Sequence, residues 1–210
     1  GNLVTKAELL SRMRTHIEAV VGRYKSDVYC WDVVNEAISN SNSVNEIYRP
    51  IDTLHQIAGE DYVEMAFRYA RAADSKAKLY YNDYRFSNPV KRQKIIDMLA
   101  RLLAKGTPID GVGLQSHYIP GEITEAYLQE TIDKISNLGL KVQITELDVS
   151  VYDYRTPGNP DLKPEDSLYT AARETIQTNM YDMLFKVYRR NRHVITGVTF
   201  WGAADSRNNF

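Results

Sequence analysis

The sequence alternates between two hydrophobic periodicities, and this alternation limits the possible folds more than any other feature. In five stretches apolar residues recur every three or four positions, which predicts helices. A short run rich in β-branched and aromatic residues follows each stretch, which predicts a buried strand. Strands that are buried on both faces and separated by helices form parallel sheets, so the sequence predicts an α/β fold. The predicted strands cover 28–34, 78–81, 109–114, 141–145 and 195–200.

The predicted helices begin and end at residues that commonly occupy such positions. Thr5 and Glu8 have the spacing of a capping box at the start of the first helix. Gly22 stands where a left-handed C-terminal cap is expected, and later helices are predicted to end at Gly106 and near Gly139. Two polar stretches are predicted loops that follow strand ends, 39–44 and 154–164.

The length of the chain separates the two common parallel α/β architectures. No glycine-rich GxGxxG or GxxxxGK[ST] loop follows a predicted strand, which weakens a doubly wound, nucleotide-binding sheet. Five units in 210 residues amount to about 42 residues each, so eight units would need about 336. We therefore expect a partial (β/α)8 TIM barrel of about five parallel strands, from which the first three βα units and the last helix are absent. Because composition does not change along the chain, residues 1–210 are predicted to belong to one domain.

Charge and hydropathy argue against several classes of function. The chain has 26 Lys and Arg against 27 Asp and Glu, a net charge of −1, whereas proteins that bind nucleic acid or membrane surfaces carry a basic excess. No apolar run approaches eighteen residues, so no transmembrane helix is expected. The start of the chain lacks the features of a secretory signal. Cys30 is the only cysteine, so no disulfide can form within the chain.

Polar side chains collect where each predicted strand ends. In parallel α/β folds this edge of the sheet carries the active site, because the loops there converge on one mouth. Five strands in succession present carboxylate, amide, imidazole or indole groups at this edge, which indicates a functional site. In chain order these residues are Asn35 and Glu36, Asn82, Asp83 and Tyr84, Gln115, Ser116 and His117, Glu146 and Asp148, and Trp201 and Asp205.

Two carboxylates on separate strands are what cleavage of a glycosidic bond requires. One must be protonated to donate to the leaving oxygen, and the other must be ionised to attack the sugar or to activate water. Glu36 and Glu146 are the candidates. An imidazole from His117, held between Glu146 and Asp148, could orient and ionise the nucleophile.

The same residues permit a rival interpretation. Carboxylates and a histidine at strand ends could bind Mg²⁺ or Mn²⁺ in a barrel similar to a sugar isomerase or an enolase. Asn35, Gln115 and Trp201 have no evident role in a metal site, however, and suit the hydroxyls and the flat face of a sugar. We therefore expect no metal and no cofactor, and the metal-dependent alternative ranks last.

These segments resemble the endo-β-1,4-xylanases of glycoside hydrolase family 10, and the resemblance covers the whole chain. Residues 31–37 (WDVVNEA) resemble the acid/base segment on the fourth barrel strand of the family. Residues 144–148 (ITELD) resemble the nucleophile segment on the seventh strand. The segments that resemble strands five, six and eight are 81–84, 113–117 and 199–202.

The resemblance implies endo-acting hydrolysis of β-1,4-xylosidic linkages by a retaining double displacement. Glu36 would be the acid/base and Glu146 the nucleophile that forms a covalent intermediate, while His117 and Asp148 would keep Glu146 ionised. The family also implies roles in binding the substrate: Asn35 at the 2-hydroxyl, Gln115 in the region of the nucleophile, Tyr84 on the leaving-group side and Trp201 in a sugar platform.

Departures from the family pattern set further expectations. The first three strands of the family are not present, so the chain should need that N-terminal barrel segment, from the same polypeptide or from a separate one. A β-1,4-glucanase of the same mechanism and an inactive carbohydrate-binding fragment stay open as alternatives. Because polymeric xylan cannot enter a cell, we expect a secreted, periplasmic or cell-surface protein.

Overall fold

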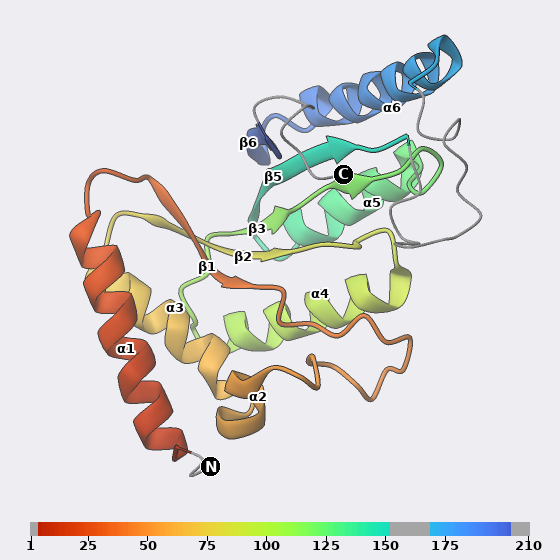
Figure 1. The fold of residues 1–210 in the computed structure, drawn as a ribbon. Helices are drawn as coiled ribbons and strands as arrows, with labels where there is room; N and C mark the ends of the chain where they lie inside the picture. Colours follow the sequence, from red (N-terminus) through yellow and green to blue (C-terminus); the bar gives the residue numbers. More distant parts are fainter. Residues whose placement is uncertain (1–3, 152–168, 203–210) are drawn as a thin grey trace.

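Helices and strands alternate along the chain in the computed structural model, which describes residues 4–151 and 169–202 (Figure 1). The helices are α1 (Lys6–Arg23), α2 (Thr53–Ala58), α3 (Asp61–Ala73), α4 (Pro89–Ala104), α5 (Glu125–Ser136) and α6 (Ala171–Arg190). The strands are β1 (Cys30–Asn35), β2 (Lys78–Asp83), β3 (Gly111–Leu114), β4 (His117–Tyr118), β5 (Lys141–Val149) and β6 (Ile195–Phe200).

The strands form one parallel sheet in the order β1-β2-β3-β5, and β6 pairs with the other side of β5. The short β4 pairs with the end of β5. A parallel sheet with helices between successive strands confirms the predicted α/β class, and it is the arrangement of part of a (β/α)8 barrel. Within the described residues, β1 and β6 are the two edges of the sheet.

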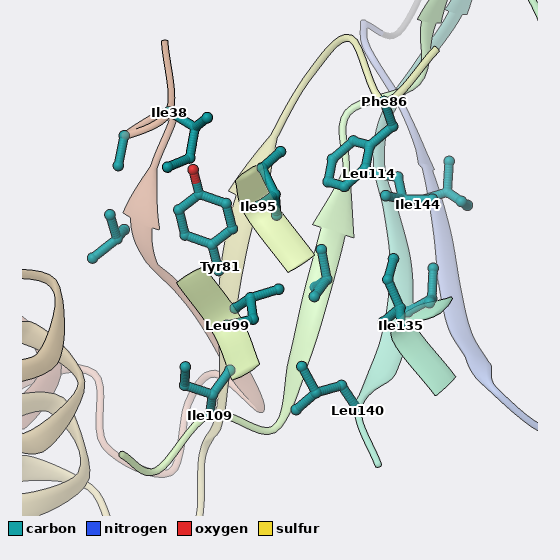
Figure 2. Packing of buried hydrophobic residues seen from close by; sticks show 14 of the residues in the cluster. Ile38, Tyr81, Phe86, Ile95, Leu99, Ile109, Leu114, Ile135, Leu140 and Ile144 are labelled. Carbon is teal, nitrogen blue, oxygen red and sulfur yellow. The ribbon is translucent and has the colours of Figure 1, made fainter. Parts of the chain in front are cut away.

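The hydrophobic core lies between the sheet and the helices that cover its outer face. Tyr81 of β2 and Leu114 of β3 belong to one buried cluster with Ile95 and Leu99 of α4, as Figure 2 shows. Each of these four side chains is at most 1% exposed. Burying a side chain of this size stabilises the fold by about 1.5–3 kcal/mol. Alternate residues of the strands therefore serve packing, and the residues between them face the inside of the sheet.

The inner face of the sheet is polar and strongly curved. The hydroxyls of Tyr80 on β2 and Thr196 on β6 lie 3.0 Å apart, although two strands separate β2 from β6 in the sheet. Gln143 of β5 donates a hydrogen bond from Nε2 to the hydroxyl of Tyr29, just before β1, at 2.6 Å. These contacts across the interior show the curvature of a barrel wall.

Two glycines of β3 make room for side chains on this inner face. A Cβ atom at Gly111 would lie 2.3 Å from Cε1 of Tyr80, and one at Gly113 would lie 2.3 Å from Oδ1 of Asn82. Any larger residue would clash at either position. Asn82 can therefore lie close against β3, a position that matters for the site.

Several predicted helix ends are confirmed. Thr5 caps α1, since its hydroxyl accepts a hydrogen bond from the Glu8 N–H at 3.2 Å. Gly106 and Gly139 follow α4 and α5 with positive φ angles of 70° and 79°. No helix in the described residues has the length and apolar character needed to cross a membrane.

The prediction of a left-handed cap at Gly22 is wrong. Helical hydrogen bonding continues past this residue, because the N–H of Tyr24 still bonds to the carbonyl of Val20, and α1 extends to Arg23. Other boundaries also differ from the predicted ones. The first strand begins at Cys30 rather than at residue 28, and β5 extends to Val149, because strand pairing continues into the polar residues of the site. The predicted loop 154–164 lies outside the described residues.

Candidate active site

The polar residues at the strand ends meet at one edge of the sheet. The Glu36 N–H donates to the carbonyl of Asn82 at 2.9 Å, which ties the end of β1 to β2. The Glu146 N–H donates to the carbonyl of Gln115 at 3.1 Å, and the Trp201 N–H is bonded to β5 in the same way. The hydrogen-bond ladder that forms the sheet therefore also fixes the backbone of the site.

Glu146 is held by two groups from other strands. Asn82 donates from Nδ2 to Oε1 of Glu146 at 3.0 Å, and Nε2 of His117 lies 3.1 Å from Oε2. Thr145 donates from its hydroxyl to Oδ1 of Asn82 at 2.7 Å, which fixes the orientation of that amide. The register of β5 against β6 shifts in this region, so the adjacent Thr145 and Glu146 can both reach Asn82.

His117 lies between two carboxylates. Its Nε2 faces Glu146, and its Nδ1 lies 3.0 Å from Oδ2 of Asp148. Burial lowers the pKa of His117, but the hydrogen bonds and charges of Asp148 and Glu146 together outweigh burial and raise the pKa above its ordinary value of 6.5. The imidazole of His117 therefore bridges the two carboxylates.

Glu36 adopts a backbone conformation that residues other than glycine rarely adopt. Its φ angle is +57°, in the left-handed region. Gln115 donates from Nε2 to Oε1 of Glu36 at 3.0 Å, and Arg49 donates from Nη2 to Oε2 at 2.7 Å. Backbone conformations of this kind cost about 1–3 kcal/mol and concentrate at functional sites. The strain at Glu36 is therefore an independent sign that its position is functional.

Three amide side chains connect the two glutamates. Oδ1 of Asn35 accepts hydrogen bonds from Gln115 at 3.1 Å and from Asn82 at 3.0 Å. Because Gln115 also bonds to Glu36 and Asn82 also bonds to Glu146, a continuous chain of hydrogen bonds joins the two carboxylates. The Nδ2 hydrogens of Asn35 have no partner among the described residues, so they are available to a ligand hydroxyl.

Aromatic side chains flank the two carboxylates. On the side of Glu36, the hydroxyl of Tyr84 accepts hydrogen bonds from Asn40 Nδ2 at 2.5 Å and from Arg49 Nη2 at 2.7 Å. On the other side, Trp201 is 46% exposed, and its ring meets His117 edge-on with centroids 5.9 Å apart. Partly exposed aromatic rings on both sides of the mouth suit a ligand with flat apolar faces and polar edges.

A buried ion pair supports Tyr84 from the side of α4. Lys91 donates from Nζ to Oδ1 of Asp83 at 2.7 Å, and the two side chains are 1% and 0% exposed. Burial raises the pKa of Asp83 and lowers that of Lys91, whereas their mutual attraction opposes both shifts. Nζ of Lys91 also lies 3.7 Å from the centre of the Tyr84 ring. The pair thereby fixes the ring against α4.

The structure brings the predicted site residues together, with one contact that differs from the expectation. The side chain of Gln115, expected in the region of the nucleophile, bonds to Glu36, and only its backbone carbonyl reaches Glu146. The reason is that Asn82 and His117 already bond to the two carboxylate oxygens of Glu146. The catalytic roles of the site residues stay predictions.

Sequence reasoning assigned no role to two residues of the site, Asn82 and Arg49. Asn82 gave a usable signal, because it ends β2 two residues after the inward-facing Tyr80 and so shares its face. Arg49 gave none, because it lies in the segment between β1 and α2, 13 residues from Glu36. Asp205, noted at the end of the last strand, lies outside the described residues.

The carboxylates of the site are paired with amide, imidazole and guanidinium groups. Within residues 4–151 and 169–202, no group of three or more His, Cys, Asp or Glu side chains is arranged to hold a metal ion. A cavity of 440 Å³ opens beside Glu36, along the edge strand β1. Its apolar lining comes from Met13, Ile17, Val33, Val34, Ile51, Leu54 and Ala66.

Comparison with known proteins agrees with this geometry. The pattern of glycosyl hydrolase family 10 matches residues 2–208. A β-1,4-xylanase of Dictyoglomus thermophilum is 42% identical over 96% of this chain and 55% of its own length. An endo-1,4-β-xylanase of Geobacillus stearothermophilus is 40% identical over 98% of this chain and 60% of its own length. The crystal structure of xylanase XynB from Paenibacillus barcinonensis superposes with a TM-score of 0.89 at 37% identity, over 98% of this chain and 60% of that one. The chain thus spans 55–60% of the length of these proteins.

Proposed function

The chain belongs to glycosyl hydrolase family 10, and we propose that it carries the catalytic carboxylates of an endo-acting β-1,4-xylanase. The observation that carries this proposal is the pair formed by Glu36 and Glu146. Both lie at the mouth of the sheet and are joined by amides, but one bonds to Arg49 and the other to His117. Relatives named as xylanases support xylan as the substrate.

In the first step, Glu36 donates its proton to the oxygen of the leaving sugar. Glu146 attacks the anomeric carbon from the opposite face, so the bond to the leaving chain breaks and an ester to Glu146 forms. His117, between Asp148 and Glu146, favours the ionised and therefore nucleophilic form of Glu146.

In the second step, the roles of the carboxyl groups change. Glu36 is now a carboxylate and takes a proton from water as the water oxygen attacks the anomeric carbon. The ester to Glu146 breaks, and the sugar leaves with its original configuration. Two inversions therefore give overall retention, which can be measured as early release of the β-anomer.

The remaining site residues bind the sugar chain in this proposal. Nδ2 of Asn35, which has no partner among the described residues, donates to the 2-hydroxyl of the reacting xylose. Gln115 holds Asn35 and Glu36 in place by a hydrogen bond to each. Tyr84 lies on the side of the leaving group because it shares Arg49 with Glu36. Trp201 offers its exposed ring as a platform for a sugar on the side of Glu146.

We propose further that the barrel is completed by an N-terminal segment from the same polypeptide or from a separate chain. Large apolar side chains are exposed just before β1, in the β1–α2 segment and in α2, where Tyr29 is 65%, Ile51 82% and Leu54 36% exposed. An unpaired edge strand beside such a surface favours association with further strands. Size-exclusion chromatography tests this proposal, because a soluble, stable monomer of 24.1 kDa would contradict it.

The location of the protein is also a proposal. Xylan is a polymer that does not cross membranes, so the enzyme should act outside the cytoplasm, in the periplasm, at the cell surface or in the medium. Immunodetection in fractionated cells of the source organism tests this, and a signal confined to the cytoplasm would contradict it.

The experiment that tests the proposed function is the release of reducing ends from xylan by the 210-residue chain. It is run with and without EDTA and beside a Glu146→Ala control. Release that survives EDTA and is lost in the control supports a xylanase that needs no dissociable metal. Faster release from β-1,4-glucan than from xylan would replace the substrate. Binding of xylan without release, by a chain shown to be folded, would support a carbohydrate-binding fragment.

A further inference from the structure

Arg49 contacts Glu36 but has no part in the reaction described above. We propose that Arg49 is a positioning residue for Glu36, which holds one oxygen of that carboxylate from the side of Tyr84 and favours its ionised form. The effect of Arg49 on catalysis rests on the proposed function. The contact itself can be tested without any turnover of substrate.

The chain returns to Glu36 after a long excursion between β1 and α2 (Figure 1). Ile38 and Tyr48 form an isolated antiparallel bridge that closes this excursion. The Arg49 N–H then donates to the carbonyl of Ala37 at 3.0 Å, so the backbone of Arg49 is fixed beside the residue that follows Glu36. The approach of Arg49 to Glu36 is therefore a property of the backbone and does not depend on one side-chain rotamer alone.

Helix α4 anchors the middle of the same excursion. Lys94 donates from Nζ to the carbonyls of Ser41 and Glu46, both at 2.7 Å. Lys91 donates from Nζ to Oδ1 of Asn40 at 2.9 Å. These bonds hold the segment against the barrel wall, which distinguishes its arginine from one on an unanchored surface loop.

The guanidinium of Arg49 bridges Glu36 and Tyr84. Nη2 lies 2.7 Å from Oε2 of Glu36 and 2.7 Å from the hydroxyl of Tyr84, and the guanidinium carbon is 5.4 Å from the centre of the Tyr84 ring. Gln115 bonds to the other carboxylate oxygen, so Glu36 has one donor on each oxygen. The guanidinium of an arginine does not lose its proton in a protein, so Arg49 keeps its charge throughout the reaction. It therefore fixes the plane of the carboxylate and favours its negative form.

Other charged groups surround Glu36, and their effects oppose one another. On α1 and the β1–α2 segment, His16, Arg49 and Asp52 line the same cavity as Glu36. Lys91 on α4 interacts electrostatically with Glu36, and Asp83 and the titratable Tyr84 at the end of β2 interact with Arg49. The titratable groups on the other strands of the site are Asp32 on β1, His117 on β4 and Glu146 on β5. Negative charge on Glu146 disfavours ionised Glu36, whereas positive charge on Lys91 favours it. Of these groups, Arg49 alone is hydrogen-bonded to Glu36 in the described part of the chain.

The test is a ¹³C NMR titration of Glu36 in chains that carry glutamate labelled at the carboxyl carbon. The Glu36 signal is assigned by its loss in Glu36→Gln. In Arg49→Met we expect the titration midpoint of Glu36 to rise by about one pH unit, because a neighbouring cation that favoured the charged form is gone. In Arg49→Lys the midpoint should stay closer to that of the unchanged chain. An unchanged midpoint in a folded Arg49→Met chain would overturn the proposal.

Three controls keep the titration interpretable. Arg68→Met removes the same charge from a partly exposed pair with Glu64 on α3, and it should leave the Glu36 midpoint unchanged. His16→Gln combined with Arg49→Met should show the same rise, which separates Arg49 from the titration of His16 in the cavity. If circular dichroism shows that Arg49→Met does not fold, Arg49→Gln removes the same charge and keeps a polar side chain at this position.

Kinetics with two leaving groups then connects the contact to catalysis. On a xylo-oligosaccharide, whose leaving sugar needs a proton, Arg49→Met should lower kcat/KM about tenfold at a pH where Glu36 is protonated. On 2,4-dinitrophenyl xylobioside, whose leaving group needs none, the change should stay within about twofold. Equal losses on both substrates would mean a general disturbance and would contradict the positioning role. If the unchanged chain cleaves neither substrate, the proposed function fails, whereas the titration still decides the contact.

Discussion

The two glutamates of the site are held in different ways. In the described part of the chain, the side chains bonded to Glu146 belong to strands, namely Asn82 near the end of β2 and His117 at the start of β4. Glu36 has one such partner, Gln115, and a second one, Arg49, that arrives by a loop. The side of Glu146, the proposed nucleophile, is thus built by the sheet. The side of Glu36, the proposed acid/base, depends on a loop that folds back onto the sheet.

The cations next to the two glutamates also differ in chemistry. His117 can lose its charge as the pH rises through its raised pKa, so the electrostatic support of Glu146 depends on pH. Arg49 keeps its charge at every pH at which the protein is folded. In the proposed mechanism, Arg49 is a permanent cation beside Glu36, which gains and loses a proton. His117 is a titratable cation beside Glu146, which stays ionised. Substitutions at each residue test this difference.

The largest effects are expected from removing each carboxylate in turn. Glu146→Ala and Glu36→Ala should each lower the hydrolysis of xylan at least about 10³-fold. With 2,4-dinitrophenyl xylobioside, Glu36→Ala should still release a burst of dinitrophenol, because this leaving group needs no acid, and Glu146→Ala should not. Stopped-flow absorbance measures the burst.

Azide sharpens the same comparison through stereochemistry. In Glu146→Ala, azide can occupy the space of the lost carboxylate and attack from its face, which gives the α-glycosyl azide. In Glu36→Ala, azide replaces the water of the second step and gives the β-glycosyl azide. Products with the two configurations exchanged, identified by NMR, would reverse the roles assigned to the two glutamates.

A large effect on stability is expected from the buried ion pair of Lys91 and Asp83, next to Tyr84. Lys91→Met leaves Asp83 buried without its cation, and we expect the free energy of unfolding to fall by about 3–5 kcal/mol. Urea denaturation measures this loss. Lys186→Met is the matched control, because it breaks an exposed pair with Asp182 and should cost no more than about 1 kcal/mol. Similar losses in the two variants would show that the buried pair contributes little.

The comparison also explains which parts of the site the sequence reveals. His117, Glu146 and Asp148 lie at the ends of strands, and the alternation of strand residues already places them on one face. Arg49 is invisible to this reasoning, because its position depends on the bridge between Ile38 and Tyr48, which brings together residues from two ends of a polar loop. The periodicity of helices and strands does not indicate where the loop between β1 and α2 folds back to Glu36.

The fold shows the same division between regular and irregular parts. The five long strands and the helices between them were predictable because each has enough residues to show a period. Helix α2, of six residues, and strand β4, of two, are too short for this and were missed. The cap expected at Gly22 failed for a related reason, since a helix ends where its hydrogen bonds end and a glycine only permits that.

A moderate effect is expected from His117, which tests the titratable side of the comparison. His117→Gln removes an imidazolium from Glu146, and a hydrogen bond to a charged group contributes about 1.5–3 kcal/mol. We therefore expect kcat/KM on xylan to fall about 10–100-fold. An unchanged kcat/KM at pH 6 would contradict the role of His117.

The effect of His117 on stability has a definite sign. Because its pKa is raised in the folded state, His117 stabilises the fold at a pH below the unfolded value of 6.5, and this contribution is lost as the pH rises through the raised value. The unchanged chain should therefore be more stable than His117→Gln at pH 5.5, and the difference should shrink above neutral pH. Urea denaturation across this range measures the change. A difference that grows with pH would contradict the assignment.

The smallest effect is expected at Asp32 on β1, where the two sides of the site influence each other. Burial, and then the negative charge of Glu146, raise the pKa of Asp32 to about 6. A carboxyl group with a raised pKa binds its proton more tightly in the folded state, so the fold loses stability as the pH rises from about 4 to 6. Asp32→Asn removes this loss. The surface of Asp32 is exposed to water even though surrounding protein atoms raise its pKa, and water weakens such effects. We therefore expect a gain of only about 1 kcal/mol at pH 7 and none at pH 3.5. Urea denaturation at the two pH values measures the difference.

Combining Asp32→Asn with Glu146→Gln should reduce the gain in stability, since one source of the raised pKa of Asp32 is then absent. Equal gains with and without the charge of Glu146 would show that burial alone acts on Asp32, and that the nucleophile side does not extend its influence to β1.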